Sequence, residues 1–176
     1  MKLLFISLGC DKNLVDSEEM LGMLAADGHE IVDDEDEAEV IIVNTCCFIG
    51  DAKEESVNTI LEMAEKKKAG TCKVLIVTGC MAQRYKKEIS EEIPEVDAIL
   101  GTTSYGDISK AVKEAQAGRH FEEYKSIDFL PDISGKRMLT TGGHFAYLKI
   151  AEGCDKHCTY CIIPRLRGGY RSVPME

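Results

Sequence analysis

Residues 40–46 read Val-Ile-Ile-Val-Asn-Thr-Cys, an unbroken apolar run that ends in two polar residues and a cysteine. The apolar part of this stretch is residues 40–43, and residues 3–6 and 74–77 are apolar runs of the same length. Such runs, without alternation of polar and apolar residues, are typical of strands buried on both faces, as in a parallel sheet. Residues 30–32 and 98–100 are weaker candidates of the same kind. The pattern therefore predicts a sheet of five strands.

Helical patterns alternate with these apolar runs. The clearest covers residues 51–70, where apolar residues recur at intervals of three and four and three lysines precede a closing glycine. Further helices are expected over about 14–26, 83–93 and 108–118. Strand–helix alternation predicts an α/β fold with an open, doubly wound, flavodoxin-like parallel sheet of order 2-1-3-4-5.

The chain divides into three parts by composition. We place the α/β domain at residues 1–120 and a linker at 121–143, where proline and glycines break any regular pattern. A new strand is expected over 144–150, at the beginning of a second domain that covers residues 144–176.

Composition limits the classes of partner. The net charge of −10 makes the chain poorly suited to bind nucleic acid through its phosphates. No apolar stretch approaches the ~18 residues of a membrane span, and the opening apolar run is too short for a signal peptide. We therefore expect a cytoplasmic protein with reduced thiols. The acidic run at residues 33–37 is interpreted as a solvated loop, with contact to a basic partner as the alternative.

Residues 153–161, Gly-Cys-Asp-Lys-His-Cys-Thr-Tyr-Cys, place Cys154, Cys158 and Cys161 in a CxxxCxxC spacing. Three thiolates can hold three irons of a 4Fe–4S cluster and leave the fourth iron open. Radical S-adenosylmethionine enzymes bind and cleave their cofactor at such an open iron. A structural zinc site needs four ligands, and His157, the nearby candidate, is adjacent to a cysteine, which disfavours tetrahedral coordination. Disulfides are disfavoured in a reducing compartment.

A second set of cysteines follows three of the expected strands. Cys10, Cys46 and Cys80 come directly after the first, third and fourth apolar runs. Because the carboxyl ends of parallel strands meet at one edge of a sheet, we expect these three thiols to converge on a ligand site. Buried packing cysteines are the alternative interpretation. Cys47 and Cys72 are interpreted as packing or surface residues that take no part in the site.

Four segments resemble the methylthiotransferases of the radical S-adenosylmethionine superfamily. They are Ser-Leu-Gly-Cys-Asp-Lys-Asn-Leu-Val-Asp-Ser-Glu (7–18), Asn-Thr-Cys-Cys-Phe-Ile (44–49), Thr-Gly-Cys-Met-Ala-Gln-Arg-Tyr (78–85) and Tyr-Leu-Lys-Ile-Ala-Glu-Gly-Cys-Asp-Lys-His-Cys-Thr-Tyr-Cys (147–161). The first segment resembles the branch that acts on a ribosomal-protein aspartate more than the branch that acts on tRNA. The resemblance implies methylthiolation, at the β-carbon, of one aspartate of small-subunit ribosomal protein twelve.

The resemblance also implies the cofactors and their ligands. It assigns two 4Fe–4S clusters, a radical-generating one on Cys154, Cys158 and Cys161 and an auxiliary, sulfur-carrying one on Cys10, Cys46 and Cys80. S-adenosylmethionine is the implied cofactor, with Tyr160 beside its adenine, and an electron donor such as flavodoxin is the implied partner.

The chain ends 15 residues after Cys161, whereas a complete β/α barrel takes ~250 residues. We therefore expect an N-terminal fragment, with the start of a barrel, that does not turn over alone. Residues 144–176 are expected to be loosely ordered or docked on the α/β domain, with Arg165, Arg167 and Arg171 as exposed loop charges. A tRNA adenosine methylthiotransferase and a non-catalytic iron–sulfur binding module are the alternatives.

Overall fold

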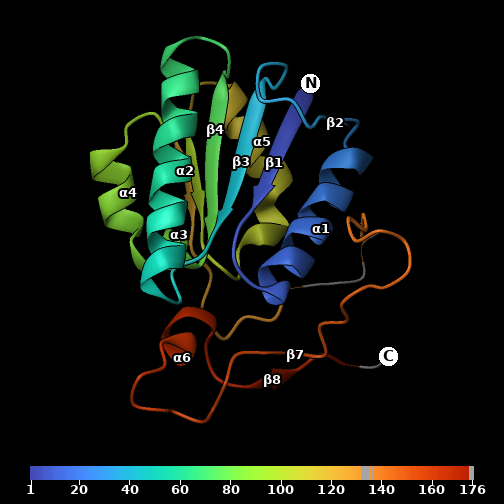
Figure 1. Ribbon diagram of the computed structural model, residues 1–176, viewed down its shortest axis with the longest axis vertical. Coiled ribbons are helices and arrows are strands. Elements are labelled where there is room, and N and C mark those ends of the chain that lie inside the picture. The colour runs from blue at the N-terminus through green and yellow to red at the C-terminus, as the bar shows by residue number, and fades with distance from the viewer. Residues whose placement is uncertain (132–134, 136, 175–176) are drawn as a thin grey trace.

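The structure, a computed structural model, describes residues 1–131, 135 and 137–174. A parallel six-stranded sheet lies between two layers of helices (Figure 1). Its strands are β1 (Lys2–Ser7), β2 (Glu30–Ile31), β3 (Val40–Thr45), β4 (Val74–Gly79), β5 (Ala98–Leu100) and β6 (Phe121–Glu123). The helices around it are α1 (Asp11–Ala26), α2 (Gly50–Lys68), α3 (Cys80–Arg84), α4 (Lys86–Glu92) and α5 (Ile108–Gln116), with a 3-10 turn, η1 (Tyr105–Asp107).

The strand order is β2-β1-β3-β4-β5-β6, so the expected order of the first five strands is confirmed. The expected number of strands is wrong, because β6 pairs in parallel with β5 at the edge of the sheet. This strand reads Phe-Glu-Glu and has no apolar run, so periodicity did not reveal it. The helix expected over 83–93 is broken at Tyr85 into α3 and α4.

Each face of the sheet has its own apolar core. Alternate residues of β3 point to opposite faces, as the pleat of a strand requires. Ile41 and Val43 pack in a cluster with Ile60 of α2, together with α3 and α4. Val40 and Ile42 belong to the other cluster, which α1 and α5 cover. The buried strands therefore need apolar residues at every position, which is the pattern seen in the sequence.

The C-terminal segment, residues 144–174, lies beneath the carboxyl ends of the strands (Figure 1). It contains the two-residue strands β7 (Ala151–Glu152) and β8 (Arg171–Ser172) and the short helix α6 (Ile163–Arg167). The strand expected over 144–150 is wrong. Carbonyl groups of that stretch accept hydrogen bonds from side chains instead, as when Arg137 donates to Tyr147 at 2.6 Å.

The expected start of a β/α barrel is not visible in the segment. A barrel is built from parallel strands joined by helices, whereas β7 and β8 pair in an antiparallel manner. Within the described residues, the segment is docked on the α/β domain rather than loosely ordered, which agrees with one of the two expected states.

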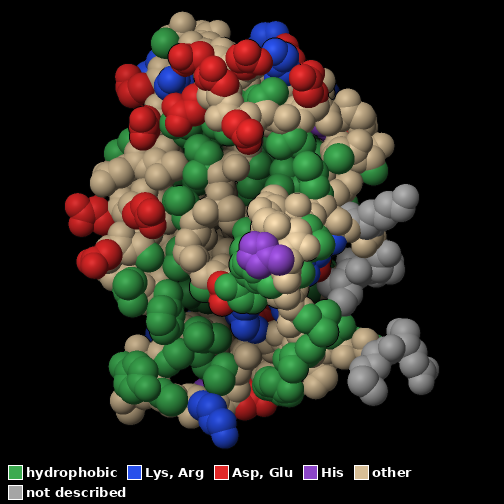
Figure 2. Space-filling view, turned by 45° about the vertical axis from the view of Figure 1, so that its right-hand side comes forward, with side chains coloured by type: hydrophobic (Ala, Val, Ile, Leu, Met, Phe, Trp, Pro, Cys, Tyr) green, Lys and Arg blue, Asp and Glu red, His purple; other side chains and the backbone are tan. Residues whose placement is uncertain are grey.

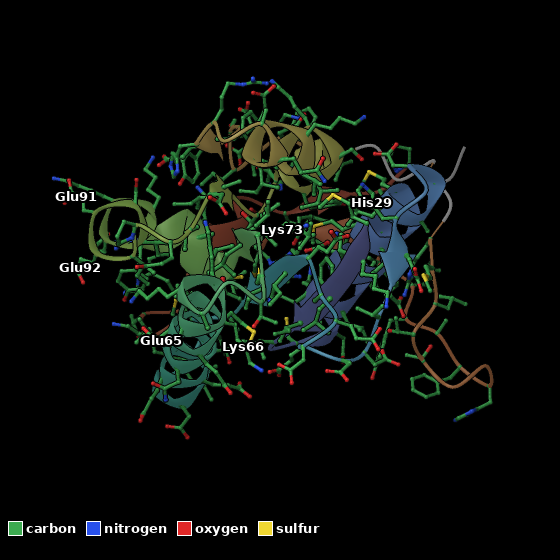
Figure 3. The ribbon with its side chains drawn as sticks, turned by 90° about the horizontal axis from the view of Figure 1, so that it is seen from above. His29, Glu65, Lys66, Lys73, Glu91 and Glu92 are labelled. Carbon is green, nitrogen blue, oxygen red and sulfur yellow. The ribbon has the colours of Figure 1, made fainter. Side chains whose placement is uncertain are left out.

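Charged side chains gather at the opposite, upper end of the molecule (Figure 2). The acidic run at residues 33–37 lies there in the loop between β2 and β3 and is mostly exposed. Lys66, near the end of α2 (Figure 3), bonds to Asp36 at 2.7 Å and to Glu35 at 3.3 Å. The interpretation as a solvated loop therefore agrees with the structure. In the described part of the chain, none of the helices has the length and apolar character needed to cross a membrane.

The central strand gives a direct test of the sheet. Ile42 is completely buried between its neighbours Phe5 and Ile76 on the paired strands. We expect Ile42→Ala to lower the free energy of unfolding by about 2–5 kcal/mol, because it leaves a cavity in a packed core. Urea unfolding followed by circular dichroism measures this. Leu61→Ala, on the exposed side of α2, is the matched control, and equal losses for the two variants would contradict the assigned burial.

Candidate functional site

Cys10, Cys46 and Cys80 line a single cavity of about 790 Å³ at the carboxyl edge of the sheet. They follow β1, β3 and β4, which are neighbours in the sheet. In the sheet, β2 lies on one side of β1 and β3 lies on its other side. The connections therefore change direction at β1 and β3, which makes this edge the topological switch point of the fold. The structure therefore places three cysteines that are distant in the sequence on the wall of one cavity, and the ligand site that they were expected to form there stays a prediction.

The three thiols differ in exposure. Cys10 is exposed, whereas Cys46 and Cys80 are 5% and 6% exposed. Burial raises the pKa of the Cys80 thiol to about 12, with Arg167 acting in the opposite direction. The thiol is therefore protonated at neutral pH in the structure as it stands, whereas a thiol that binds a metal must lose its proton. All eight cysteines of the chain are free, so no disulfide uses them.

Two glycines allow the strand ends to approach one another. Gly9 has a φ of +95°, and a Cβ there would lie 2.6 Å from the Cβ of Cys46 and 2.9 Å from its Sγ. Gly79 has a φ of +94°, and a Cβ there would lie 2.5 Å from the backbone oxygen of Thr45. Both positions therefore combine a left-handed backbone with a close contact that excludes larger residues.

Asn13 joins two of the strand ends behind the cavity. Its buried Nδ2 donates hydrogen bonds to the backbone oxygens of Leu8 and Thr45, each at 2.9 Å. Asn44 in turn donates from Nδ2 to the backbone oxygen of Asn13 at 3.0 Å. Sequence reasoning did not identify Asn13, because a polar residue near the start of a helix is usually solvent-exposed.

Arg167 of α6 reaches the same place from the C-terminal segment. Its guanidinium donates to Asn13 Oδ1 at 2.6 Å, to Asp16 Oδ2 at 2.9 Å and to Glu152 Oε2 at 2.8 Å. The side chain is 4% exposed and also lines the cavity. The expectation that Arg167 is an exposed loop charge is therefore wrong, whereas Arg165 on the same helix is exposed. Nothing in the local sequence distinguishes the two arginines, since the difference arises from acids more than 10 positions away.

Five charged residues form what we call the ion cluster: Lys12, Asp16, Lys149, Glu152 and Arg167. Lys149 pairs with Asp16 and, at 3.4 Å, with Glu152, while Lys12 bonds to Glu152 at 3.3 Å. Burial alone would raise the pKa of Glu152, but Arg167, Lys149 and Lys12 outweigh it and lower that pKa to about 2. The ion cluster thus anchors the C-terminal segment to α1.

A buried acid holds the stretch that precedes this segment. Glu18 of α1 is completely buried and pairs with Arg137, and it accepts hydrogen bonds from the backbone nitrogen and Oγ1 of Thr140 at 2.7 and 2.9 Å. Burial opposes ionisation, but these bonds together hold the pKa of Glu18 below its usual value. Residues 137–141 are therefore fastened to the α/β domain as well.

Cys154, Cys158 and Cys161 lie together on the loop between β7 and α6. The backbone nitrogen of Cys161 donates to the oxygen of Cys158 at 3.0 Å, and that of Cys154 donates to Gly168 at 3.1 Å. Cys158 is exposed and the other two are half-buried, and none of the three lines the cavity. Tyr160 on the same loop is 88% exposed.

Across the described ranges, no group of three or more His, Cys, Asp or Glu side chains is arranged to hold a single metal ion. A 4Fe–4S cluster is larger than a single ion. Each thiolate binds a different iron of the cluster, so the three sulfur atoms need not meet at one point. The cavity, with three free cysteines and Gly9 at its walls, fits a group of that size and donor preference better than it fits one ion. Cys47 and Cys72 are buried in the apolar core, as expected of packing residues.

Fold and cavity define the class as a doubly wound α/β protein with three convergent cysteines at its switch point. Comparison with known proteins identifies the family. A family model described as uncharacterized protein family UPF0004 matches residues 2–101, and the chain belongs to this family.

The chain is also similar to curated proteins named ribosomal protein uS12 methylthiotransferase RimO. The relative from Lachnoclostridium phytofermentans is 64% identical over all of this chain and 40% of its own length. Those from Clostridioides difficile and Geobacter sulfurreducens are 52% and 50% identical over 100% and 99% of this chain and 40% and 39% of their lengths. The resemblance to the ribosomal-protein branch is confirmed, and the chain spans about two fifths of the length of these relatives.

Gly79 tests whether the strand ends depend on close backbone approach. We expect Gly70→Ala, at an open position with a φ of +85°, to cost about 1–2 kcal/mol of stability from its left-handed backbone alone. Gly79→Ala should cost more than twice as much, because its Cβ also meets the backbone of Thr45. Urea unfolding of both variants measures the difference, and equal costs would show that the Gly79 contact can relax freely.

The pKa of Glu152 predicts a pH dependence of stability. Because this pKa is lowered from 4.5 to about 2 in the folded state, the ionised form stabilises the fold fully above about pH 4.5. That contribution is lost as the pH falls from 4.5 toward 2. We expect wild-type stability to fall more steeply than that of Glu152→Gln in this range, by up to about 1.4 kcal/mol per pH unit.

Urea unfolding at several pH values between neutral and about 3 measures the two slopes. Glu91→Gln, at an exposed position of α4, is the control and should follow the wild-type slope. Parallel curves for wild type and Glu152→Gln would contradict the assigned charge environment.

Proposed function

We propose that this chain is part of a radical S-adenosylmethionine methylthiotransferase that modifies an aspartate of ribosomal protein uS12 at its β-carbon. The observation that carries the proposal is the convergence of Cys10, Cys46 and Cys80 on one cavity. The 64% identity with a relative named uS12 methylthiotransferase, over all of this chain, supports the substrate. The activity is that of the longer protein, which these relatives represent.

Two 4Fe–4S clusters are the cofactors that the six cysteines would hold. Cys10, Cys46 and Cys80 would bind the auxiliary cluster in the cavity, and Cys154, Cys158 and Cys161 would bind the radical-generating cluster on the loop. When bound, the clusters would supply a carrier for the sulfur to be inserted and the electron that cleaves S-adenosylmethionine.

The chain's own residues prepare the cavity for this chemistry. Phe48, Ile49, Ile163 and Leu166 all line the cavity and make its surface largely apolar. Lys12 also lines the cavity, and its ammonium is bonded to Glu152 at 3.3 Å. An unactivated C–H bond has no acidic proton for a general base, so the reaction calls for radical chemistry, and an apolar lining suits it.

The remaining partners follow from the same reaction. S-adenosylmethionine would bind at the cysteine loop, with the exposed Tyr160 beside its adenine. An electron donor such as flavodoxin would supply reducing equivalents, and the modification of a ribosomal protein places the reaction in the cytoplasm. The net charge of −10 makes this part of the protein poorly suited to bind tRNA phosphates, and the opening segment, residues 7–18, resembles the ribosomal-protein branch more than the tRNA branch.

Iron content tests the proposal. After anaerobic reconstitution with iron and sulfide, we expect about eight irons per chain, because two cubanes hold four each. Cys46→Ala and Cys158→Ala should each reduce the content to about four irons, since each removes a ligand of a different cluster. Iron analysis and visible absorbance measure the result.

Cys72→Ala is the matched control, because Cys72 is buried at the other end of β4, and it should keep the full iron content. A wild-type content of about four irons that Cys46→Ala removes and Cys158→Ala does not would support the cluster in the cavity. The same result would contradict a cluster on the loop in this chain. Iron that ignores both substitutions, or a single tightly bound zinc, would contradict the whole proposal.

A further inference from the structure

The ion cluster connects two sites that are far apart in the sequence. Arg167 lines the cysteine cavity and bonds to Asn13, which holds the ends of β1 and β3. The same guanidinium bonds to Glu152 at 2.8 Å. Glu152 ends β7, which precedes the loop of residues 153–162, and Arg167 ends α6, which follows it, so their contact joins the two elements on either side of that loop and closes its base.

Helix α6 also supplies part of the cavity wall. Ile163, Leu166 and Arg167 all line the cavity, and Leu166 is buried in the same apolar cluster as Cys80. The backbone oxygen of Leu166 accepts a hydrogen bond from Thr102 Oγ1 at 2.7 Å, which fastens α6 beneath β5. The cavity is therefore incomplete without the C-terminal segment.

The chemistry of the contact requires an arginine. A planar guanidinium has five N–H donors in a fixed arrangement, so one side chain can bond to the amide of Asn13 and to the carboxylates of Asp16 and Glu152 at once. A lysine could supply the charge but not this geometry. Asp16 and Glu152 are both buried, so removal of the arginine would leave their charge undercompensated.

We propose that Arg167 is a positioning residue that locks Asn13 against the ends of β1 and β3 and, through Glu152, closes the base of the cysteine loop. One side chain thereby holds the cysteine cavity and the cysteine loop in a single arrangement. The proposal concerns the chain without any bound cluster and so stands independently of the proposed function.

Thiol accessibility tests this coupling in the reduced, metal-free protein. The rate of alkylation by iodoacetamide is measured at each cysteine by mass spectrometry, and hydrogen exchange is measured over the loop. We expect Arg167→Gln to raise the alkylation rate of Cys80 about tenfold or more and to speed exchange in residues 153–162, because local opening exposes both. Arg165→Gln, an exposed position on the same helix, should change neither.

An internal control separates local coupling from general loosening. Cys72 is buried at the opposite end of β4 and should stay protected in Arg167→Gln. Equal gains in reactivity at Cys72 and Cys80 would overturn the proposal, as would a Cys80 that stays protected. Arg167→Lys should restore protection only in part, since it returns the charge without the bond to Asn13.

A second variant keeps the test decisive if Arg167→Gln fails to fold. Glu152→Gln removes the charge pair at the base of the loop but leaves the bonds from Arg167 to Asn13 and Asp16. We expect faster exchange in the loop with Cys80 still protected. Exposure of Cys80, or an unchanged loop, in this variant would contradict the separate roles assigned to the two contacts.

Discussion

The carboxamide of Asn13 is the contact on which the arrangement of the site depends. Its Nδ2 holds the ends of β1 and β3 together at the switch point, and its Oδ1 accepts a hydrogen bond from Arg167. Strand ends at a switch point diverge into loops on opposite sides of the sheet, so side chains rather than a continuing ladder must hold them together beyond that point. A buried amide with both donors and acceptor used satisfies these groups and fixes the edge on which Cys10 and Cys46 lie.

The ion cluster shows how buried charges can fix the orientation of side chains while adding little to the free energy of folding. Taking Asp16 and Glu152 out of water is costly, and their partners only offset that cost. What the cluster provides is orientation, because Arg167 cannot leave one acceptor without disturbing the others. The lowered pKa of Glu152 is the sign of this balance, since burial opposes the charge and the surrounding cations restore it.

The two sets of cysteines are presented differently. The cavity set lies on rigid strand ends, two of its members buried, with glycines allowing the backbones to approach. The loop set lies between β7 and α6, with Cys158 exposed and the other two half-buried, and the contact of Glu152 with Arg167 joins these two elements. The cavity cysteines are thus fixed by the ends of the sheet strands, whereas the loop cysteines lie on a connection whose middle is open to solvent.

The sequence alone determined the first five strands of the sheet and their order, because strands buried on both faces need unbroken apolar runs such as residues 40–43. It also placed Cys10, Cys46 and Cys80 at one edge. Only the tertiary structure revealed β6, whose Phe-Glu-Glu has no periodic signal and pairs because β5 offers an edge. It also decided that Arg167 is buried while Arg165 is exposed. Local patterns in the sequence show which residues avoid water. A buried charge such as that of Arg167 instead depends on partners that only the fold brings near it, here Asn13 and Glu152, so a local pattern cannot reveal it.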